Sequence, residues 1–201
     1  MPDGLRRFQE TNHSHFVTFS CWHRRRYFKS DDLYSLFVQR LEAARTRFDF
    51  RLYGYVVMPE HVHLLLSERT KQKLADAIHH LKLSFSKRAR SLHAASAQVS
   101  VQKMDANLGH TSTSFWEKRY HDRNVRDYHE FAVKLNYLHR NPVKRGLVES
   151  PEEWRWSSYR HYALREPSPV ELESEWTARD RAQRAGEKRI FLLPNQEPVI
   201  R

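Results

Sequence analysis

The sequence predicts an α+β fold, an antiparallel sheet of about four strands with helices on one face. Segments in which apolar and polar residues alternate with a period of two indicate strands. Between them lie segments whose apolar residues recur at helical spacing. The resulting order is strand, helix, strand, strand, helix, strand, helix, which fits a sandwich of the ferredoxin-like type.

The first two elements occupy the N-terminal quarter of the chain. Residues 14–20 alternate apolar and polar residues and are rich in β-forming types, which predicts a strand. Residues 21–27 extend it into a basic rim. Ser30 is the expected N-cap of a helix that ends near residue 47, because Asp31 and Asp32 follow it where acidic groups suit the positive helix end.

The next strands are separated by a short interruption. Residues 50–57 and 61–67 predict the second and third strands, and Pro59 breaks them apart because proline cannot donate to a sheet ladder. A helix is expected from Lys73 to about Leu92, with an apolar face and a basic face. Beyond it, up to residue 113, weak periodicity predicts a mobile connection.

The C-terminal half predicts one more strand and two helices. Residues 114–125 form the expected fourth strand, and residues 128–141 a helix that should end before Pro142. Residues 151–162 predict a short helix with proline at its start. A length of 201 residues fits one domain with extensions, so we expect a domain over residues 1–165 and an extended tail over residues 166–201.

The charge balance indicates an anionic partner. Lys and Arg number 35 against 24 Asp and Glu, a formal charge of +11, and the pI is near 9.9. Nucleic acid is the first expectation and an anionic membrane the second, while incidental basicity stays possible. The basic residues do not follow one amphipathic helix with a large apolar face, and no apolar stretch approaches the roughly 20 residues that span a bilayer.

Cysteine usage and the N-terminal residues indicate a compartment. Cys21 is the single cysteine, so no intramolecular disulfide can form, which suits a reducing cytoplasm. The N-terminal residues lack an apolar run ahead of a small-residue cleavage site, as a signal peptide would have. We therefore expect a soluble cytoplasmic protein.

His61 and His63 are candidate metal ligands. Side chains two residues apart in a strand point to the same face, so both imidazoles can converge on one ion. With one cysteine, a thiolate-based zinc site is excluded. Mixed nitrogen and oxygen ligation suits Mn²⁺, or Mg²⁺ together with substrate phosphate oxygens. The alternative is a pair of ordinary polar strand residues.

Tyr137 and Asn141 form a second candidate pair. They lie four residues apart on a predicted helix and therefore share a face. That face can present a phenol and an amide oxygen to the same point. The amide oxygen could be a third metal ligand, and the phenol could attack a bound phosphate. The alternatives are a tyrosine that packs on an apolar face and an asparagine that ends a helix before proline.

Four segments together resemble the signatures of the HUH tyrosine transposases, in the same order. They are residues 56–66 (VVMPEHVHLLL), 115–123 (FWEKRYHDR), 137–148 (YLHRNPVKRGLV) and 156–159 (WSSY). Within that superfamily the chain is most similar to the REP-associated tyrosine transposases, relatives of the single-strand insertion-sequence transposases. The resemblance covers about residues 14–162.

The resemblance implies a role for each candidate residue. His61 and His63 match the metal-binding histidines, Tyr137 the single nucleophilic tyrosine, and Asn141 a position that can complete the metal shell. It further implies a bacterial, nucleoid-associated endonuclease and strand transferase that needs Mg²⁺ or Mn²⁺. Such an enzyme cuts and rejoins single-stranded hairpin DNA through a 5′-phosphotyrosine, as a monomer or a homodimer.

Basic residues interleaved with aromatic ones suit a groove that tracks phosphates and stacks bases. For any single basic residue the alternative is a solvated charge. For Trp116 and Trp156 we favour core packing. The helix over residues 73–92 is the candidate for contacting a hairpin stem. The expected DNA-binding residues are Arg24, Arg25, Arg26, Lys82, Lys87, Arg88, Arg90, Lys118, Arg119, Arg123, Lys144 and Arg145.

Two other functions compete with this one. A DNA-binding protein that recognises hairpins without cutting them would not need His61, His63, Tyr137 and Asn141 together. A replication initiator or relaxase of the same superfamily usually brings further large domains. The hairpin sequence and the cleavage dinucleotide stay open. So does the group that deprotonates Tyr137, for which the metal and Lys134 are candidates.

Overall fold

The computed structural model describes residues 14–67, 73–96 and 114–185. Four strands and five α-helices make up this part, with two short 3₁₀-helices, η1 (Trp22–Arg24) and η2 (Pro151–Glu153). In chain order they are β1 (Ser14–Ser20), α1 (Asp31–Phe48), β2 (Arg51–Val57), β3 (His61–Ser67), α2 (Leu74–Ser96), β4 (His121–Val125), α3 (Tyr128–Lys144), α4 (Tyr159–Leu164) and α5 (Glu175–Ala185).

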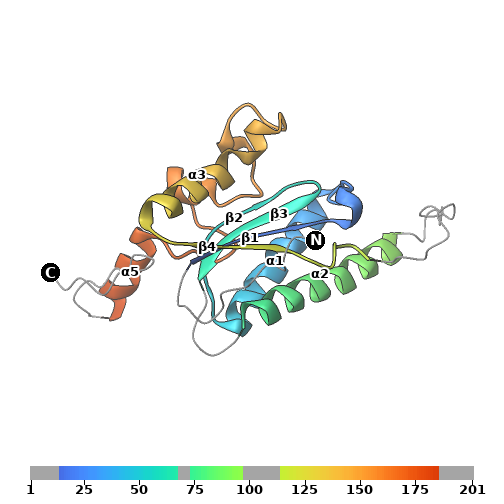
Figure 1. Cartoon of the computed structure of the whole chain (residues 1–201), viewed down its shortest axis with the longest axis horizontal. Coiled ribbons are helices and arrows are strands. Elements are labelled where there is room, and N and C mark those ends of the chain that lie inside the picture. Colours follow the sequence, from blue (N-terminus) through green and yellow to red (C-terminus); the bar gives the residue numbers. More distant parts are fainter. Residues whose placement is uncertain (1–13, 68–72, 97–113, 186–201) are drawn as a thin grey trace, which may run out of the picture.

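The four strands form one antiparallel sheet in the order β2-β3-β1-β4 (Figure 1). β1 is central and pairs with both β3 and β4, so that Thr18 lies beside His63 on one side and beside His121 on the other. Directly opposed residues of paired strands share a sheet face. The predicted α+β class and the four-stranded antiparallel sheet are confirmed.

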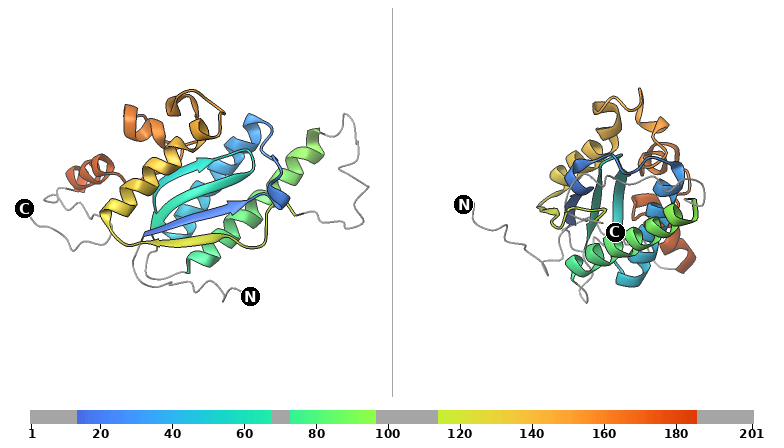
Figure 2. Two further views of the ribbon diagram at one scale, coloured as in Figure 1. Left: turned by 45° about the horizontal axis from the view of Figure 1, so that its top comes forward. Right: turned by 90° about the vertical axis from the view of Figure 1, so that its right-hand side faces the viewer.

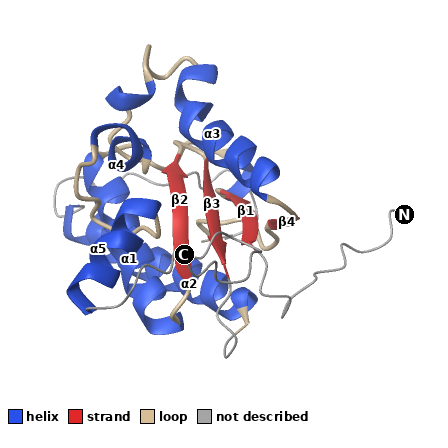
Figure 3. Ribbon diagram, turned by 90° about the vertical axis from the view of Figure 1, so that its left-hand side faces the viewer, coloured by secondary structure: helices blue, strands red, loops and turns tan. Residues whose placement is uncertain are grey.

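Helices cover both faces of the sheet, which corrects the expectation that they lie on one face. α1 and α2 pack on one face and α3 on the other (Figure 3). The reason lies in the strands, which are apolar on both sides: Val62, Leu64 and Leu66 face α1 and α2, while Leu65 faces α3. A strand buried on both faces reads as a continuous apolar run, here HVHLLLS.

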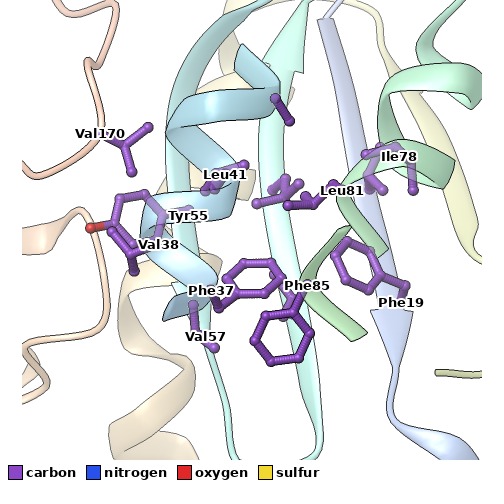
Figure 4. Packing of buried hydrophobic residues seen from close by; sticks show 14 of the residues in the cluster. Phe19, Phe37, Val38, Leu41, Tyr55, Val57, Ile78, Leu81, Phe85 and Val170 are labelled. Atoms are coloured by element: carbon purple, nitrogen blue, oxygen red, sulfur yellow. The ribbon is translucent and has the colours of Figure 1, made fainter. Parts of the chain in front are cut away.

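The larger core lies between the sheet and the α1–α2 layer. Phe19 of β1, Phe37 of α1 and Phe85 of α2 meet there, each at most 1% exposed (Figure 4). Leu41 and Leu81 continue the same layer. The apolar stripes predicted for these two helices are therefore their buried faces.

The outer edge of β2 is covered by the chain that follows α3. Val57 N donates to Trp156 O at 2.9 Å, Ser158 N to Tyr55 O at 2.9 Å, and Glu173 N to Leu52 O at 2.7 Å. Open strand edges invite pairing with other chains, and these bonds occupy this one. Figure 2 shows the orange and red C-terminal elements on the β2 side of the sheet, away from β4.

The expected extended tail over residues 166–201 is wrong for its described part. Val170 and Leu172 are buried in the α1-side core, and α5 follows with Ala178 and Ala182 buried. The prolines of this segment suggested an extended chain. Val170 and Leu172 become buried only because the chain passes around the β2 edge. Residues 186–201 lie outside the described residues.

Several predicted boundaries also move. α3 continues through Pro142 to Lys144 because proline within the last turn removes only one helical donor. β4 starts at residue 121, and Trp116 makes only an isolated bridge to Cys21. Ser30 is the N-cap of α1 but makes no side-chain cap bond. The short helix predicted over residues 151–162 divides into η2 and α4.

α2 extends to Ser96, so the connection predicted over residues 93–113 is helical at its start. The remainder, residues 97–113, lies outside the described residues. In the part of the chain that the structure describes, no helix is both long enough and apolar enough to cross a membrane.

The close approach of α3 to β2 yields a stability prediction. A Cβ on Gly54 would lie 2.6 Å from Leu135 Cδ1 and 3.2 Å from Ser158 Oγ. Although valine is favoured in strands, Gly54→Val should lower the free energy of unfolding by about 1–3 kcal/mol through overpacking. Urea denaturation measures it. The double variant with Leu135→Ala should lose less free energy of unfolding than the sum of the losses in the two single variants. Strict additivity of the two losses would contradict the contact.

A buried histidine on α3 predicts acid sensitivity. His139 Nε2 lies 2.8 Å from Ser158 Oγ, and burial lowers the pKa of His139 to about 3. Because an unfolded histidine has a pKa near 6.5, the unfolded chain binds a proton that the folded chain excludes between about pH 6.5 and 3. Stability should fall as pH falls through this window, by up to about 1.4 kcal/mol per pH unit from this residue.

The control for this effect is His139→Gln, whose amide can still reach Ser158 but does not titrate. Urea denaturation at about pH 7.5 and about pH 5 should show a smaller acid loss in the variant than in the wild type. An equal loss in both proteins would remove His139 as its source.

Candidate active site

The two histidines stand at the start of β3, on the sheet face that α3 covers. The turn before the strand is closed by Met58 N donating to His61 O at 2.8 Å. His61 and His63 are 4% and 5% exposed, and their Nε2 atoms lie 3.0 Å apart. The strand places both rings on one face, as their spacing predicted.

Each histidine has a partner at its other ring nitrogen. His63 Nδ1 lies 2.7 Å from Thr18 Oγ1, and His61 Nδ1 lies 3.2 Å from Glu60 Oε1. When Nδ1–H donates to these oxygens, the Nε2 lone pairs of both rings face the same point. Burial lowers the pKa of His61 and lowers that of His63 to about 3, so both rings are neutral at neutral pH.

Asn141 approaches the same point from α3. Its side chain is buried, and Nδ2 lies 3.1 Å from His63 Nε2. The amide therefore presents its nitrogen, a donor, to the imidazole lone pair. A half-turn of the amide would bring in its oxygen, the atom expected as a metal ligand.

This donor set fits a divalent cation. Nitrogen ligands lie about 2.1 Å from such an ion, so two Nε2 atoms 3.0 Å apart can share one. Two neutral imidazoles facing each other through lone pairs are also more favourable with a cation between them. No group of three or more His, Cys, Asp and Glu side chains suited to a metal occurs among the described residues.

Tyr137 lies one helical turn before Asn141, at the edge of the histidine pair. The residue is 39% exposed, and its ring centroid is 5.6 Å from that of His63. Phe16 of β1 stacks on His63 at 5.2 Å and meets Tyr137 edge-on at 6.0 Å. The phenol is thus held beside the candidate metal ligands while still open to solvent.

Two lysines of α3 flank this aromatic group. Lys144 Nζ lies 5.2 Å from the ring centroid of Tyr137, and Lys134 Nζ lies 5.2 Å from that of Phe16. Arg24, the last residue of η1, contributes electrostatically to the lowered pKa of both His61 and His63. Basic side chains of α3 and η1 therefore lie near Tyr137, Phe16 and the two histidines.

Six further basic candidates are exposed, and two of them also pair with a glutamate. Arg25, Arg26, Lys118 and Arg119 are exposed. Arg123 Nε donates to Glu130 Oε1 at 2.8 Å, and Arg145 Nη2 donates to Glu60 Oε1 at 2.6 Å. Contact of any of these residues with DNA stays a prediction.

The α2 candidates lie in the layer opposite α3. Lys87, Arg88 and Arg90 are exposed there, on the side of the sheet away from His61 and His63. Lys82 is partly buried and donates from Nζ to Glu117 O at 2.6 Å and to Lys118 O at 3.2 Å. Lys82 thus binds the backbone of the segment before β4. The sequence analysis predicted only a DNA contact for this residue.

The aromatic candidates mostly pack. Trp116 is 4% exposed in the larger core, and Trp156 stacks on Tyr34 with centroids 5.1 Å apart. Trp154 Nε1 donates to Val57 O at 3.0 Å. Core packing, the reading favoured for Trp116 and Trp156, is confirmed.

Three residues of the site escaped sequence reasoning. Thr18 and Phe16 contact His63 only because β1 pairs with β3 in one register, which the linear sequence does not specify. Glu60 directly precedes His61, and this adjacency was an available signal. Arg145 was expected to contact DNA, and in the structure it donates a hydrogen bond to Glu60.

Comparisons with known proteins show what the chain is similar to. A relative from Haemophilus influenzae (strain ATCC 51907 / DSM 11121 / KW20 / Rd), named "Putative REP-associated tyrosine transposase", is 27% identical over 113 residues, 56% of this chain and 60% of the relative. The chain thus spans 60% of the length of the curated relative it matches.

A solved structure of a REP-associated tyrosine transposase bound to a REP hairpin shares the fold. Its TM-score is 0.62 at 17% sequence identity, over 85% of this chain and 94% of that chain. The family model described as "Transposase IS200 like" matches residues 9–141, more than half of the chain. The chain therefore belongs to the family of IS200-like transposases.

Proposed function

We propose that this chain is a metal-dependent endonuclease and strand transferase that acts on single-stranded hairpin DNA through Tyr137. One observation carries the proposal. α3 brings the phenol of Tyr137 and the amide of Asn141 to the same pair of converging imidazoles, within 5.6 Å between ring centroids and 3.1 Å between atoms. A protein that only binds DNA has no need of this arrangement.

His61, His63 and Asn141 would hold the cation. The family implies a divalent metal in general, and the nitrogen and oxygen donors favour Mg²⁺ or Mn²⁺. When bound, such an ion binds phosphate oxygens and neutralises charge that develops on them. Because both imidazoles are neutral at neutral pH, their lone pairs are available without prior loss of a proton.

Tyr137 would act as the nucleophile. Its oxygen forms a bond to the scissile phosphorus while the bond from phosphorus to the 3′-oxygen breaks. The phenol proton leaves to solvent or a nearby base, and the departing 3′-oxygen takes up a proton. A 5′-phosphotyrosine and a free 3′-hydroxyl result. Attack by a 3′-hydroxyl reverses these steps and rejoins the strand without ATP.

The charges around Tyr137 support this step. Lys144 lies against the tyrosine ring, and Lys134 and Arg24 lie near His63. These cations favour a phosphate at the mouth of the site and stabilise negative charge that develops on the phenol oxygen. All of these groups come from one chain, so a monomer contains every proposed residue.

A hairpin substrate is supported by the shared fold. The solved structure that is similar over 85% of this chain binds a REP hairpin. Hairpins offer unpaired bases beside a stem, which side chains can read. The exposed residues Arg25, Arg26, Lys118 and Arg119 are the candidates for holding the strand.

Removal of the nucleophile gives the first activity prediction. The wild type, incubated with a labelled REP-like hairpin oligonucleotide and Mn²⁺, should form an SDS-stable adduct, and Tyr137→Phe should form none. Tyr128→Phe is the matched control, because Tyr128 is an exposed tyrosine on the same helix. An adduct that persists in Tyr137→Phe would refute the nucleophile. Hairpin binding without any wild-type adduct would support the alternative of a binder that does not cleave.

Removal of a ligand gives the second activity prediction. His63→Ala should lower adduct formation by at least about 100-fold, because one imidazole of the proposed metal pair is lost. Chelation of the wild type by EDTA should have a similar effect, reversed by added Mn²⁺. His79→Ala, an exposed histidine on α2, should leave the rate unchanged. Adduct formation indifferent to EDTA would contradict the metal role.

A further inference from the structure

Glu60 joins the end of α3 to the start of β3. Its carboxylate is buried, at 5% exposure, and Oε1 receives two contacts. Arg145 Nη2 donates to it at 2.6 Å, and His61 Nδ1 lies 3.2 Å away. Arg145 follows the last residue of α3, the helix that carries Tyr137 and Asn141. A line of three side chains therefore links the nucleophile helix to the first imidazole.

We propose that Glu60 and Arg145 are positioning residues for His61. Glu60 accepts the Nδ1 proton of His61 and so directs the Nε2 lone pair toward His63, and Arg145 fixes the carboxylate for that task. The inference deepens the proposed function, on which it rests, because it concerns the same metal pair. It also gives Arg145 a role that differs from the DNA contact expected from the sequence.

The geometry separates Glu60 from the metal ligands themselves. Its Oε1 contacts Nδ1 of His61, which lies across the imidazole ring from Nε2. The same oxygen is already bound by Arg145. An acceptor at Nδ1 fixes the tautomer and the ring orientation of a metal-binding histidine and increases the basicity of its other nitrogen.

The second histidine offers a comparison within the same site. His63 Nδ1 faces the neutral hydroxyl of Thr18, whereas His61 Nδ1 faces a carboxylate. Of these two hydrogen-bonding partners, only the carboxylate of Glu60 is linked to the end of α3, through its bond to Arg145. Displacement of the end of α3 would therefore disturb His61 through Glu60 as well as moving Asn141 away from His63.

Arg145 acts as a positioning residue rather than as a DNA contact if its replacement weakens metal binding in the absence of DNA. Its side chain is 48% exposed, so both roles are open to it sterically. A DNA contact predicts weaker hairpin binding with unchanged metal binding. A positioning residue predicts weaker metal binding in the absence of DNA. The two measurements on the same variants decide between them.

The first measurement is Mn²⁺ affinity of the full chain without DNA, by electron paramagnetic resonance of free Mn²⁺. Glu60→Gln should weaken binding by about 10- to 100-fold, as for other partners of metal-binding histidines. Arg145→Ala should weaken it in the same direction, and Arg145→Lys should recover part of the loss. Arg160→Ala removes an arginine of similar exposure that pairs with Glu166, and should match the wild type.

The second measurement needs no metal. Long-range ¹H–¹⁵N spectra of the imidazoles, assigned with His61→Gln, report which nitrogen of His61 carries the proton. The metal-free wild type should show Nδ1–H, and Glu60→Gln and Arg145→Ala should raise the fraction of Nε2–H. Thr18→Val should instead change His63, which shows that the readout is specific to each ring.

The outcomes separate the two proposals. Wild-type protein that binds no Mn²⁺ would refute the metal part of the proposed function, and the tautomer of His61 would then decide the positioning role by itself. Wild-type protein that binds Mn²⁺, with unchanged affinity and an unchanged His61 tautomer in Glu60→Gln and Arg145→Ala, would overturn the inference. Loss of hairpin binding alone in Arg145→Ala would assign that residue to DNA.

Discussion

The contact between α3 and the sheet is the interaction on which the candidate site depends. Leu135 and Leu138 of α3 pack on Gly54 of β2, where the absence of a side chain lets the helix come close. Phe131 and Leu65 extend the same contact. Residues three and four apart on a helix share a face. The packing of these apolar residues therefore also fixes the positions of Tyr137 and Asn141. A shift of the helix would separate them from His63.

This contact explains why polar groups are tolerated in the interior. His61, His63, Asn141 and Glu60 are all buried, and each has a hydrogen-bonding partner within 3.2 Å. Buried polar groups without partners cost free energy, whereas a connected set is tolerated and becomes rigid. The site is thus a polar network enclosed at one end of an apolar layer. Tyr137 lies beside this network and is 39% exposed, which suits its proposed role as a nucleophile.

The C-terminal segment contributes to the same arrangement from outside. Residues 156–158 bind along β2, and Ser158 meets His139 of α3 and the backbone of Tyr55. The segment therefore supports α3 from the side opposite β4 and occupies the free edge of the sheet. Its continuation through Val170 and Leu172 into the α1 layer connects the two helical layers around that edge.

Local sequence determined the elements and the chemical types of the site. Alternation and helical spacing predicted three of the four strands and the main helices within a few residues, because these periods follow from backbone geometry alone. The fourth strand was expected from residue 114 and begins at His121. The spacing of His61 and His63 predicted a shared face for the same reason, and that of Tyr137 and Asn141 predicted another. Where a segment lacked a clear period, as at residues 114–120 and 166–185, the prediction was wrong.

The tertiary structure decided which faces meet. Periodicity shows that a strand has two apolar sides but not that α3 takes one and α1 with α2 the other. Strand order and register placed Thr18 and Phe16 beside His63. The packing of α3 on the sheet placed Arg145, at the end of that helix, beside Glu60. These contacts join residues from 45 to 85 positions apart, and they form only when apolar burial and strand pairing are satisfied together over the whole chain. The sequence alone therefore predicted the candidate ligands and the candidate nucleophile, and only the packed fold determined which groups contact them.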